Sequence, residues 1–436
     1  MLESPMDASV RVRGYTGNGG DKGGGWGPDG SHCLCFCSNN YLGLANHPEV
    51  VEAGLKGLRD YGAGTASVRF ICGTFSPHEA LEQAIARYMG TEASYSFVSC
   101  WNANEAIFPT LCEAGDMIIS DELNHASIID AIRLAGVIKK GLLRGVYKHN
   151  DLAMLRTKLE EAKANPEMKG QIWVVTDGVF SMEGDIADLP AMRKLCDEFD
   201  AMLVVDDSHG HGVMGETGRG THEYWGMVGA VQEATEGRSH EGTKGGSHER
   251  KAPSMPSPSS LRASDPSSLP APSVPSSLPQ IDLFTGTLGK ALGGAAGGFV
   301  AGPRRAIELL IQRGRPTLFS NALPVSVACS ATKAIEILMK EPQRVARLRD
   351  NCTYARTKIR EAGFTVIDSP TAICPIIVHD TAKAIAMSRR LLELGVFVIG
   401  FGFPVVPEGH ARLRVQISAA HDKTHIDGLV AALKRL

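Results

Sequence analysis

Short apolar runs that alternate with helical stretches constrain the fold of this chain more than any other feature. Six runs, rich in apolar and β-branched residues, are each followed by a more polar stretch; they cover residues 94–99, 117–120, 172–176, 202–205, 283–285 and 298–301. Strands that are apolar along their whole length are buried on both faces, as in a parallel sheet covered by helices. The pattern predicts an α/β fold with a mainly parallel central sheet, in which ligands bind at the carboxyl ends of the strands.

The rest of the chain divides into segments of different character. Residues 1–32 are rich in glycine and show no period, which predicts a flexible N-terminal arm. Residues 33–321 form the predicted large domain, and residues 322–436 show helical and then α+β patterns typical of a smaller C-terminal domain. Within the large domain, the Pro/Ser-rich stretch at 226–280 predicts a disordered insertion, because it has too few apolar groups to offset its chain entropy.

Composition narrows the class of ligand and compartment. The net charge of −3, with both signs mixed, gives no sign of a nucleic-acid surface or a polybasic membrane face. No apolar run reaches the roughly 20 residues that span a bilayer, and the N-terminus lacks the apolar core of a signal peptide, so a soluble protein with a small ligand is expected.

The cysteines give no sign of a metal site. The ten cysteines form no CxxC pair and no Cys/His cluster at zinc spacing, so no bound metal is expected. Cys33, Cys35 and Cys37 alternate, which places them on one face of a strand as small apolar residues. We expect free thiols and therefore a reducing compartment.

Lys290 lies in a turn of small residues that follows one of the apolar runs. Gly289, Gly293 and Gly294 allow the backbone to approach a planar ligand without a Cβ in the way, and Thr287 places a hydroxyl three residues before the lysine. This setting suits a lysine that forms a Schiff base. A solvated lysine in a surface turn is the alternative.

Asp206 ends another run, and His209 follows three residues later. A buried carboxylate needs a cationic partner, and a pyridinium nitrogen would supply one. An acid held against that nitrogen keeps a pyridoxal ring protonated and able to accept carbanion electrons. The alternatives are a helix N-cap for Asp206 and a core histidine bonded to backbone for His209.

Two further turns join a strand to a helix. Asn124 is the predicted cap of a helix that begins at His125, whose imidazole could lie flat against an aromatic ring. Cys100 and Trp101 also enter a helix, so their amides could hold a phosphate at its positive end. An ordinary turn between strand and helix would show the same pattern.

Arg412 and Arg414 lie two residues apart on a predicted strand and therefore share one face. One of them could bind a substrate carboxylate through two parallel hydrogen bonds. A solvated charged face is the alternative interpretation.

Together these motifs occur in the order typical of the α-oxoamine synthases, a family of pyridoxal-phosphate enzymes that the chain resembles over about residues 33–225 and 281–436. The resemblance implies the aspartate-aminotransferase-like fold (fold type I). The stretch at 64–74 is most similar to members that act on glycine, and the stretches at 176–182 and 404–421 agree. An acyltransferase that interconverts glycine and acetyl-CoA with 2-amino-3-oxobutyrate and CoA is therefore implied, in threonine catabolism and as a homodimer with shared active sites.

The resemblance leaves two alternatives: another enzyme of the family, or a non-catalytic subunit. Other α-oxoamine synthases make 5-aminolevulinate, 8-amino-7-oxononanoate or sphingoid bases. Some members are non-catalytic partner subunits, which tend to lose the lysine that Lys290 retains here.

Residue roles are implied in the same way. Lys290 would form the Schiff base with pyridoxal 5'-phosphate and then act as the base, Asp206 would pair with the pyridine nitrogen, His209 would bond the ring hydroxyl, and His125 would stack on the ring. The phosphate would be held by Thr287 and the amides of Cys100 and Trp101, with Ser320 and Asn321 reaching from the partner subunit. Ser181 would lie near the ring hydroxyl, and Asn39 and Arg414 would bind the substrate carboxylate.

The chain departs from the family pattern in several places. A glycine-rich arm stands where the family has an N-terminal helix that helps bind CoA, and Trp101 and His211 are unusual at their positions. The insertion lengthens the path between His209 and Lys290, but the cost of loop closure grows slowly with length, so the site can still assemble. The family's compartment is mitochondrial if the source is eukaryotic and otherwise cytoplasmic.

Overall fold

The structure is a computed structural model that describes residues 1–13, 32–228 and 280–436. Residues 14–31 of the predicted arm and most of the predicted insertion at 226–280 lie outside these ranges. Within them, no helix combines the length and apolar character that crossing a membrane requires.

A seven-stranded sheet forms the centre of the large domain, with strand order β3-β9-β8-β7-β6-β4-β5. The strands are β3 (Ala93–Phe97), β4 (Met117–Asp121), β5 (Leu143–Tyr147), β6 (Ile172–Asp177), β7 (Ala201–Asp206), β8 (Leu283–Thr287) and β9 (Gly298–Gly302). Strand β9 runs antiparallel to both of its neighbours, and the other pairs are parallel. The predicted, mainly parallel central sheet is therefore confirmed.

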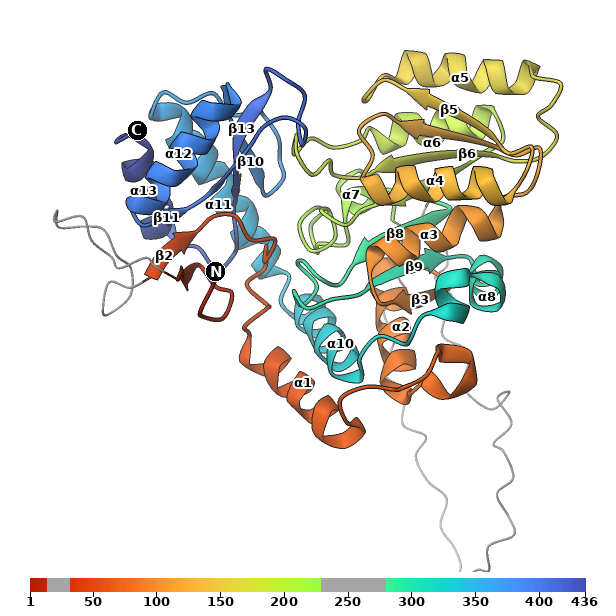
Figure 1. The fold of residues 1–436 in the computed structure, drawn as a ribbon, viewed down its shortest axis with the longest axis horizontal. Helices are drawn as coiled ribbons and strands as arrows, with labels where there is room; N and C mark the ends of the chain where they lie inside the picture. The colour runs from red at the N-terminus through yellow and green to blue at the C-terminus, as the bar shows by residue number, and fades with distance from the viewer. Residues whose placement is uncertain (14–31, 229–279) are drawn as a thin grey trace, which may run out of the picture.

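Helices cover both faces of this sheet, which explains the uninterrupted apolar runs (Figure 1). Neighbouring residues such as Val204 and Val205 are both buried but belong to two different hydrophobic clusters, one on each face. One face packs against α3 (Cys100–Leu111), α4 (Ala126–Ile138) and α8 (Arg304–Arg313). The other packs against α2 (Ser76–Met89), α5 (Leu152–Ala164), α6 (Leu189–Glu198) and α10 (Val325–Lys340).

Four further helical elements belong to the described part of the large domain. They are α1 (Pro48–Tyr61), the helical turn η1 (Arg69–Gly73), α7 (Thr221–Tyr224) and α9 (Arg315–Phe319). Strand β5 was not among the predicted runs. It lies at the sheet edge, where Arg144 and Val146 are exposed and Gly145 interrupts the apolar pattern, so it lacks the signature of a strand buried on both faces.

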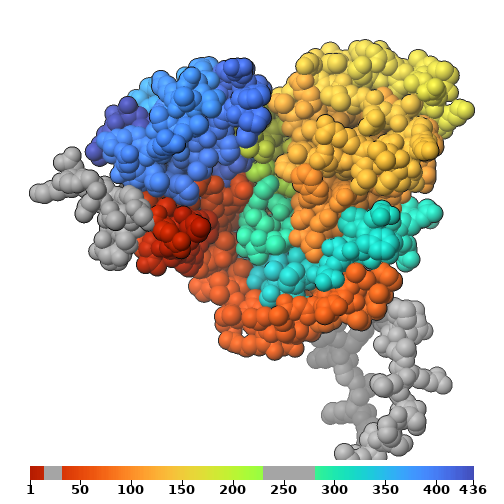
Figure 2. All heavy atoms as spheres, in the orientation of Figure 1, coloured from red at the N-terminus to blue at the C-terminus, as the bar shows by residue number. Residues whose placement is uncertain are grey.

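The C-terminal domain is the predicted smaller α+β unit. Its antiparallel sheet has the order β10-β13-β12, with β10 (Ile373–His379), β13 (Ala411–Gln416) and β12 (Ile399–Phe401). The helices α11 (Gln343–Glu361), α12 (Thr381–Glu393) and α13 (Lys423–Leu433) pack around it. Figure 2 shows this domain and the large domain as two lobes that meet along a furrow.

The domain boundaries differ from the prediction at both ends. Part of the arm that was predicted to be flexible, residues 1–13, contains strand β1 (Ser9–Arg11), which pairs with β2 (His32–Cys35). Strand β2 in turn pairs with β11 (Val396–Phe397), so the start of the predicted large domain belongs beside the C-terminal domain (Figure 1). Helix α10, predicted as the start of the C-terminal domain, instead packs along α1 and α2.

The pairing of β1 has a simple physical reason. Val10 is fully buried in a small cluster with Cys33 and Cys35, against which Cys37 also packs. Val10 of β1 and the two cysteines on one face of β2 therefore cover one another. The prediction that the three cysteines share one apolar face is confirmed, and all ten cysteines are free thiols.

Candidate active site

Acidic and polar side chains gather where three neighbouring parallel strands end. Asp177 closes β6 and lies opposite Asp206, which closes β7 and lies opposite Thr285 of β8. Lys290 follows three residues after β8 ends. The carboxyl edge of the sheet therefore brings the predicted acid and the predicted lysine into one region, as expected for an α/β sheet.

Asp206 is buried and accepts hydrogen bonds from three groups. Its Oδ2 accepts from Asn104 Nδ2 at 2.6 Å and from the Cys100 thiol at 3.7 Å, and its Oδ1 accepts from the Ser208 amide at 3.0 Å. Burial favours the neutral acid, but the hydrogen bonds from Ser208 and Asn104 and the charge of Lys290 lower the pKa of Asp206 below its ordinary value. The group is an anion held in the protein interior.

Lys290 is not a solvated surface lysine. Burial lowers the pKa of its amine, and the charge of Asp206 opposes that shift. The turn that carries it depends on Gly294, whose φ is +71° and where a Cβ would lie 2.6 Å from the Cβ of Ala45. Only glycine combines that backbone conformation with so close an approach.

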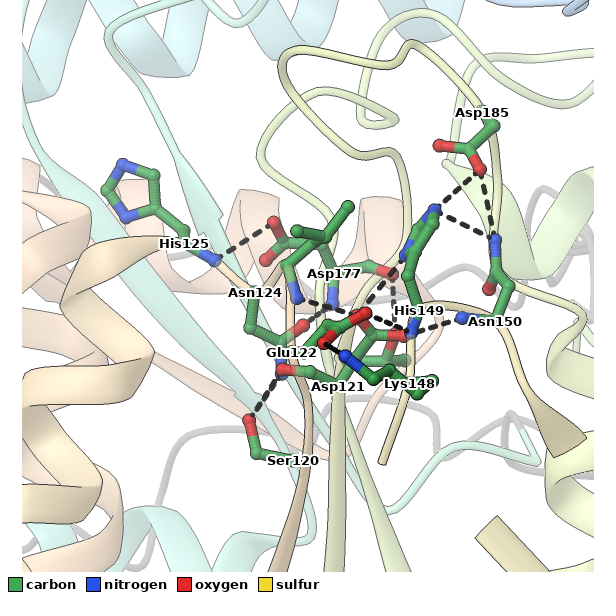
Figure 3. A network of polar contacts seen from close by, with 12 residues as sticks. Ser120, Asp121, Glu122, Asn124, His125, Lys148, His149, Asn150, Asp177 and Asp185 are labelled. Atoms are coloured by element: carbon green, nitrogen blue, oxygen red, sulfur yellow. Dashed lines mark hydrogen bonds and ion pairs between the residues drawn. The ribbon is translucent and has the colours of Figure 1, made fainter. Parts of the chain in front are cut away.

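Asn124 has a different role from the predicted one. The N-cap of α4 is His125, and the helix begins at Ala126. The side-chain nitrogen of Asn124 donates to Ser120 Oγ and to the Val175 carbonyl, both at 2.9 Å (Figure 3). Its side-chain oxygen accepts from the backbone amide of Asp177 at 2.7 Å. Asn124 therefore ties β4 to β6 beneath the site instead of capping the helix.

The ring of His125 is held in one orientation. Its Nδ1 accepts from the Ser127 amide at 3.2 Å and lies 2.7 Å from the Ser127 hydroxyl, while its backbone amide donates to Asp177 Oδ2 at 3.2 Å. Burial lowers the pKa of His125, so the ring is neutral at physiological pH. The ring centroid lies 6.2 Å from that of Trp101.

The start of α3 and the end of β8 form a cradle of backbone amides and one hydroxyl. Ser99 caps α3 by accepting from the Asn102 amide, so the amides of Cys100 and Trp101 have no acceptor within the helix. Thr287 Oγ1 lies beside them through its hydrogen bond to the Gly297 carbonyl at 3.2 Å. A Cβ on the next residue, Gly298, would fall 2.3 Å from the Cys100 nitrogen. This cradle has the chemistry of a phosphate site.

His209 belongs to a chain of side chains that crosses between the domains. Its Nδ1 lies 2.8 Å from the hydroxyl of the fully buried Tyr41, and that hydroxyl donates to Asn39 Oδ1 at 3.2 Å. Burial, together with the charges of Lys290 and Arg414, holds the pKa of His209 well below its usual range. The alternative of a histidine bonded to backbone is not what the structure shows.

The two arginines of β13 have different partners, and both are buried rather than solvated. Arg412 donates to the carbonyls of His410 and Met182 and forms an ion pair with Glu183 at 3.2 Å. Arg414, by contrast, has two buried nitrogens, Nε and Nη2, with no hydrogen-bond partner. Burial lowers its pKa, against the charge of Glu183. Arg414 therefore presents open donors that suit a carboxylate.

Three predicted residues form no hydrogen bond with Asp206, Lys290 or His209 in the described part of the chain. Ser181 is part of the loop that follows β6 and is partly buried. Asn321 forms an isolated bridge with Val68, and it lines a small hollow together with Ser320 and Asn102. Their roles toward a cofactor, including the reach of Ser320 and Asn321 into a partner subunit, stay predictions.

Sequence reasoning missed several side chains that shape the site. Asn104 follows Cys100 by four residues on α3, so helical spacing alone places both on the face that contacts Asp206. Tyr41 had no such signal, because its partner His209 is 168 residues away. Asp177 closes a predicted strand, and its position at the carboxyl edge could have marked it.

Comparisons with known proteins agree with this geometry. The sequence pattern of the family described as aminotransferase class I and II matches residues 31–238 and 260–433. A 2-amino-3-ketobutyrate coenzyme A ligase of Salmonella typhimurium is 40% identical over 408 residues, covering 94% of this chain and 88% of that protein. The mitochondrial human 2-amino-3-ketobutyrate coenzyme A ligase is 41% identical over 399 residues, covering 92% and 81%.

Other similar proteins carry the names of different synthases and transferases. An 8-amino-7-oxononanoate synthase of Alkaliphilus oremlandii is 38% identical over 408 residues, covering 94% of this chain and 88% of that protein. The structure of a Sphingomonas wittichii serine palmitoyltransferase is 28% identical with a TM-score of 0.76, covering 93% and 88%. A structure of SPT with a PLP internal aldimine is 26% identical with a TM-score of 0.78, covering 98% and 89%.

These matches confirm the resemblance to the α-oxoamine synthases and the predicted fold type I architecture. The chain belongs to the aminotransferase class I and II family.

Proposed function

We propose that the chain is a pyridoxal-phosphate-dependent acyltransferase that interconverts glycine and acetyl-CoA with 2-amino-3-oxobutyrate and CoA. The observation that carries the proposal is a half-buried lysine and a buried, ionised aspartate at one sheet edge, together with the unpaired donors of Arg414. The names of the relatives from Salmonella typhimurium and human support the choice of substrates. Threonine catabolism, which yields the same amino ketone, is the proposed pathway.

The residues present fit pyridoxal 5'-phosphate. The amide cradle at Cys100 and Trp101, with the Thr287 hydroxyl, would hold the phosphate, and Asp206 would hold a proton on the ring nitrogen. The neutral His125 ring would pack against the cofactor. When bound, the cofactor supplies an aldehyde that links to amines and a ring that accepts the electron pair of a broken Cα–H bond.

The protein's own groups then move the proton and orient the substrate. Arg414 would bind the glycine carboxylate through its two open nitrogens, and Asn39, which accepts a hydrogen bond from Tyr41, would assist it. The Lys290 amine would take the proton from the glycine Cα, and its lowered pKa makes the neutral base available at a lower pH than for an exposed lysine. The Cα–H bond breaks, a Cα–acyl bond forms at the thioester carbonyl, and CoA leaves with the sulfur.

A matrix of acyl donors and amino acids tests the substrates. We expect the purified protein with pyridoxal phosphate to turn over glycine with acetyl-CoA at least about tenfold faster than any other pair, judged by kcat/KM. Release of free CoA thiol and the mass of the product are the measurements. Faster turnover of alanine or serine with a longer acyl-CoA would overturn the proposal in favour of the other synthases.

A homodimer is also proposed, on the basis of exposed apolar side chains. Phe70, Ile71 and Phe319 are 59%, 69% and 72% exposed, and their segments lie side by side because Val68 bridges to Asn321. Such a patch favours burial against a second copy. Analytical ultracentrifugation is expected to give twice the chain mass of 46.5 kDa, and a monomer at micromolar concentration would contradict this.

If the source is eukaryotic, the mitochondrion is the proposed compartment, as named for the human and bovine relatives.

A further inference from the structure

The loop of residues 178–188 that follows β6, here called the β6–α6 loop, is bound to both domains. From the C-terminal domain, Arg412 donates to the Met182 carbonyl at 2.9 Å, and Thr371 Oγ1 donates to the Gly184 carbonyl at 2.7 Å. From the large domain, His149 Nε2 lies 2.8 Å from Asp185 Oδ2. The loop position therefore depends on contacts from two sides.

His149 holds its side of the loop between two carboxylates (Figure 3). Its Nδ1 lies 3.2 Å from Asp121 Oδ1, and its Nε2 faces Asp185. An ionised carboxylate only accepts hydrogen bonds, so both ring nitrogens must carry protons to satisfy this geometry. His149 is therefore an imidazolium that bridges the end of β4 to the β6–α6 loop.

The surroundings of His149 support the charged form. Burial lowers its pKa, but the hydrogen bonds to Asp121 and Asp185 raise it overall to about 10. The Phe180 ring lies edge-on to it, with centroids 4.3 Å apart, and Glu122 accepts from the His149 backbone amide and pairs with Lys148. Asn150 Nδ2 lies 3.5 Å from His149 Nε2 and donates to the same Asp185 oxygen at 3.1 Å. Asp121 is fully buried, so its charge is poorly screened and its loss of a cationic partner would be costly.

Glu183 of the same loop interacts with both arginines of β13. It pairs with Arg412 at 3.2 Å, and its charge also acts on Arg414. Arg414 has unpaired donors, so a free Glu183 carboxylate would be a strong intramolecular competitor for any carboxylate ligand of Arg414.

We propose that His149 is a positioning residue: by fixing Asp185 it holds the β6–α6 loop so that Glu183 stays on Arg412 and Arg414 remains open for the substrate carboxylate. This inference rests on the proposed function, because it takes glycine as the ligand of Arg414. It assigns to His149 an effect on substrate binding without any contact to the substrate.

The test is the variant His149→Gln, which keeps the size and polarity of the side chain but removes its charge. We expect the KM for glycine to rise about tenfold while kcat stays within about threefold, since only ground-state binding is impaired. The double variant His149→Gln/Glu183→Gln is expected to recover most of the KM, because the competing carboxylate is gone. Lys148→Gln, a neighbouring exposed cation, is the matched control and should leave KM unchanged.

A second measurement needs neither cofactor nor substrate. In the cofactor-free protein, cleavage after Glu183 by a glutamate-specific protease should be about fivefold faster in His149→Gln than in the wild type or Lys148→Gln, because the loop loses its only cationic contact to Asp185 among the described residues and keeps there only the bond from Asn150. Equal cleavage rates, or a raised KM that Glu183→Gln does not recover, would overturn the inference. If the wild type shows no activity with glycine and acetyl-CoA, the proposed function fails, and the cleavage rates still decide the role of His149 in the loop.

Discussion

Replacing Lys290 with alanine is expected to lower kcat by about 10⁴-fold, the upper end of what a positioned general base contributes. The reason is that the Lys290 amine lies beside Asp206 and Cys100 in the site, and burial lowers its pKa so that it can act as a base. The initial rate of CoA release with saturating glycine and acetyl-CoA is the measurement. Unfolding should occur at nearly the wild-type temperature, since alanine removes a buried charge and no hydrogen-bonded partner.

Two observations separate this role from a structural one. Borohydride reduction of the wild type loaded with pyridoxal phosphate should attach the cofactor mass to the peptide that contains Lys290, and Lys290→Ala should take up no label there. The exposed lysine Lys56 provides the control, and Lys56→Ala should keep wild-type kcat. A label on another lysine, or a Lys290→Ala variant with more than about a tenth of wild-type kcat, would contradict the assignment.

The fold was predictable where a strand is buried on both faces, because such a strand has an uninterrupted apolar sequence. Val204 and Val205 are both apolar because helices cover both sheet faces, and this rule applied to six of the seven strands. It failed for β5, where an edge position allows Arg144 to be exposed. It also failed for β1, because three residues with one buried valine are too short for a period to be visible.

Site residues were predictable only where the neighbouring sequence carries a signal. Asp206 and Lys290 could be proposed because strand ends and glycine-rich turns are visible in the sequence, and the topology then brings them together. The link between His149 and Asp185 has no local signal, because it joins loops after two strands that are not neighbours in the sheet. Likewise, the spacing of Arg412 and Arg414 predicted one shared face, but which guanidinium stays open depends on Glu183.

Replacing Asp206 with asparagine is expected to lower kcat by a factor of about 10² to 10⁴. The proposed partner of Asp206 is the protonated ring nitrogen of the cofactor. Removing one partner of a buried ion pair costs about 3–5 kcal/mol, and each 1.4 kcal/mol is a factor of ten. Asp207 is the matched control, since adjacent residues point in opposite directions: its carboxylate accepts from the amide and hydroxyl of Thr221 and lies against Gly210 and Gly220. Asp207→Asn should therefore lower the unfolding temperature while kcat per folded molecule and the visible absorbance of the bound cofactor stay the same. Equal losses of kcat in the two variants would show that the acid acts on folding, and the pairing of Asp206 with a ring nitrogen would have to be abandoned.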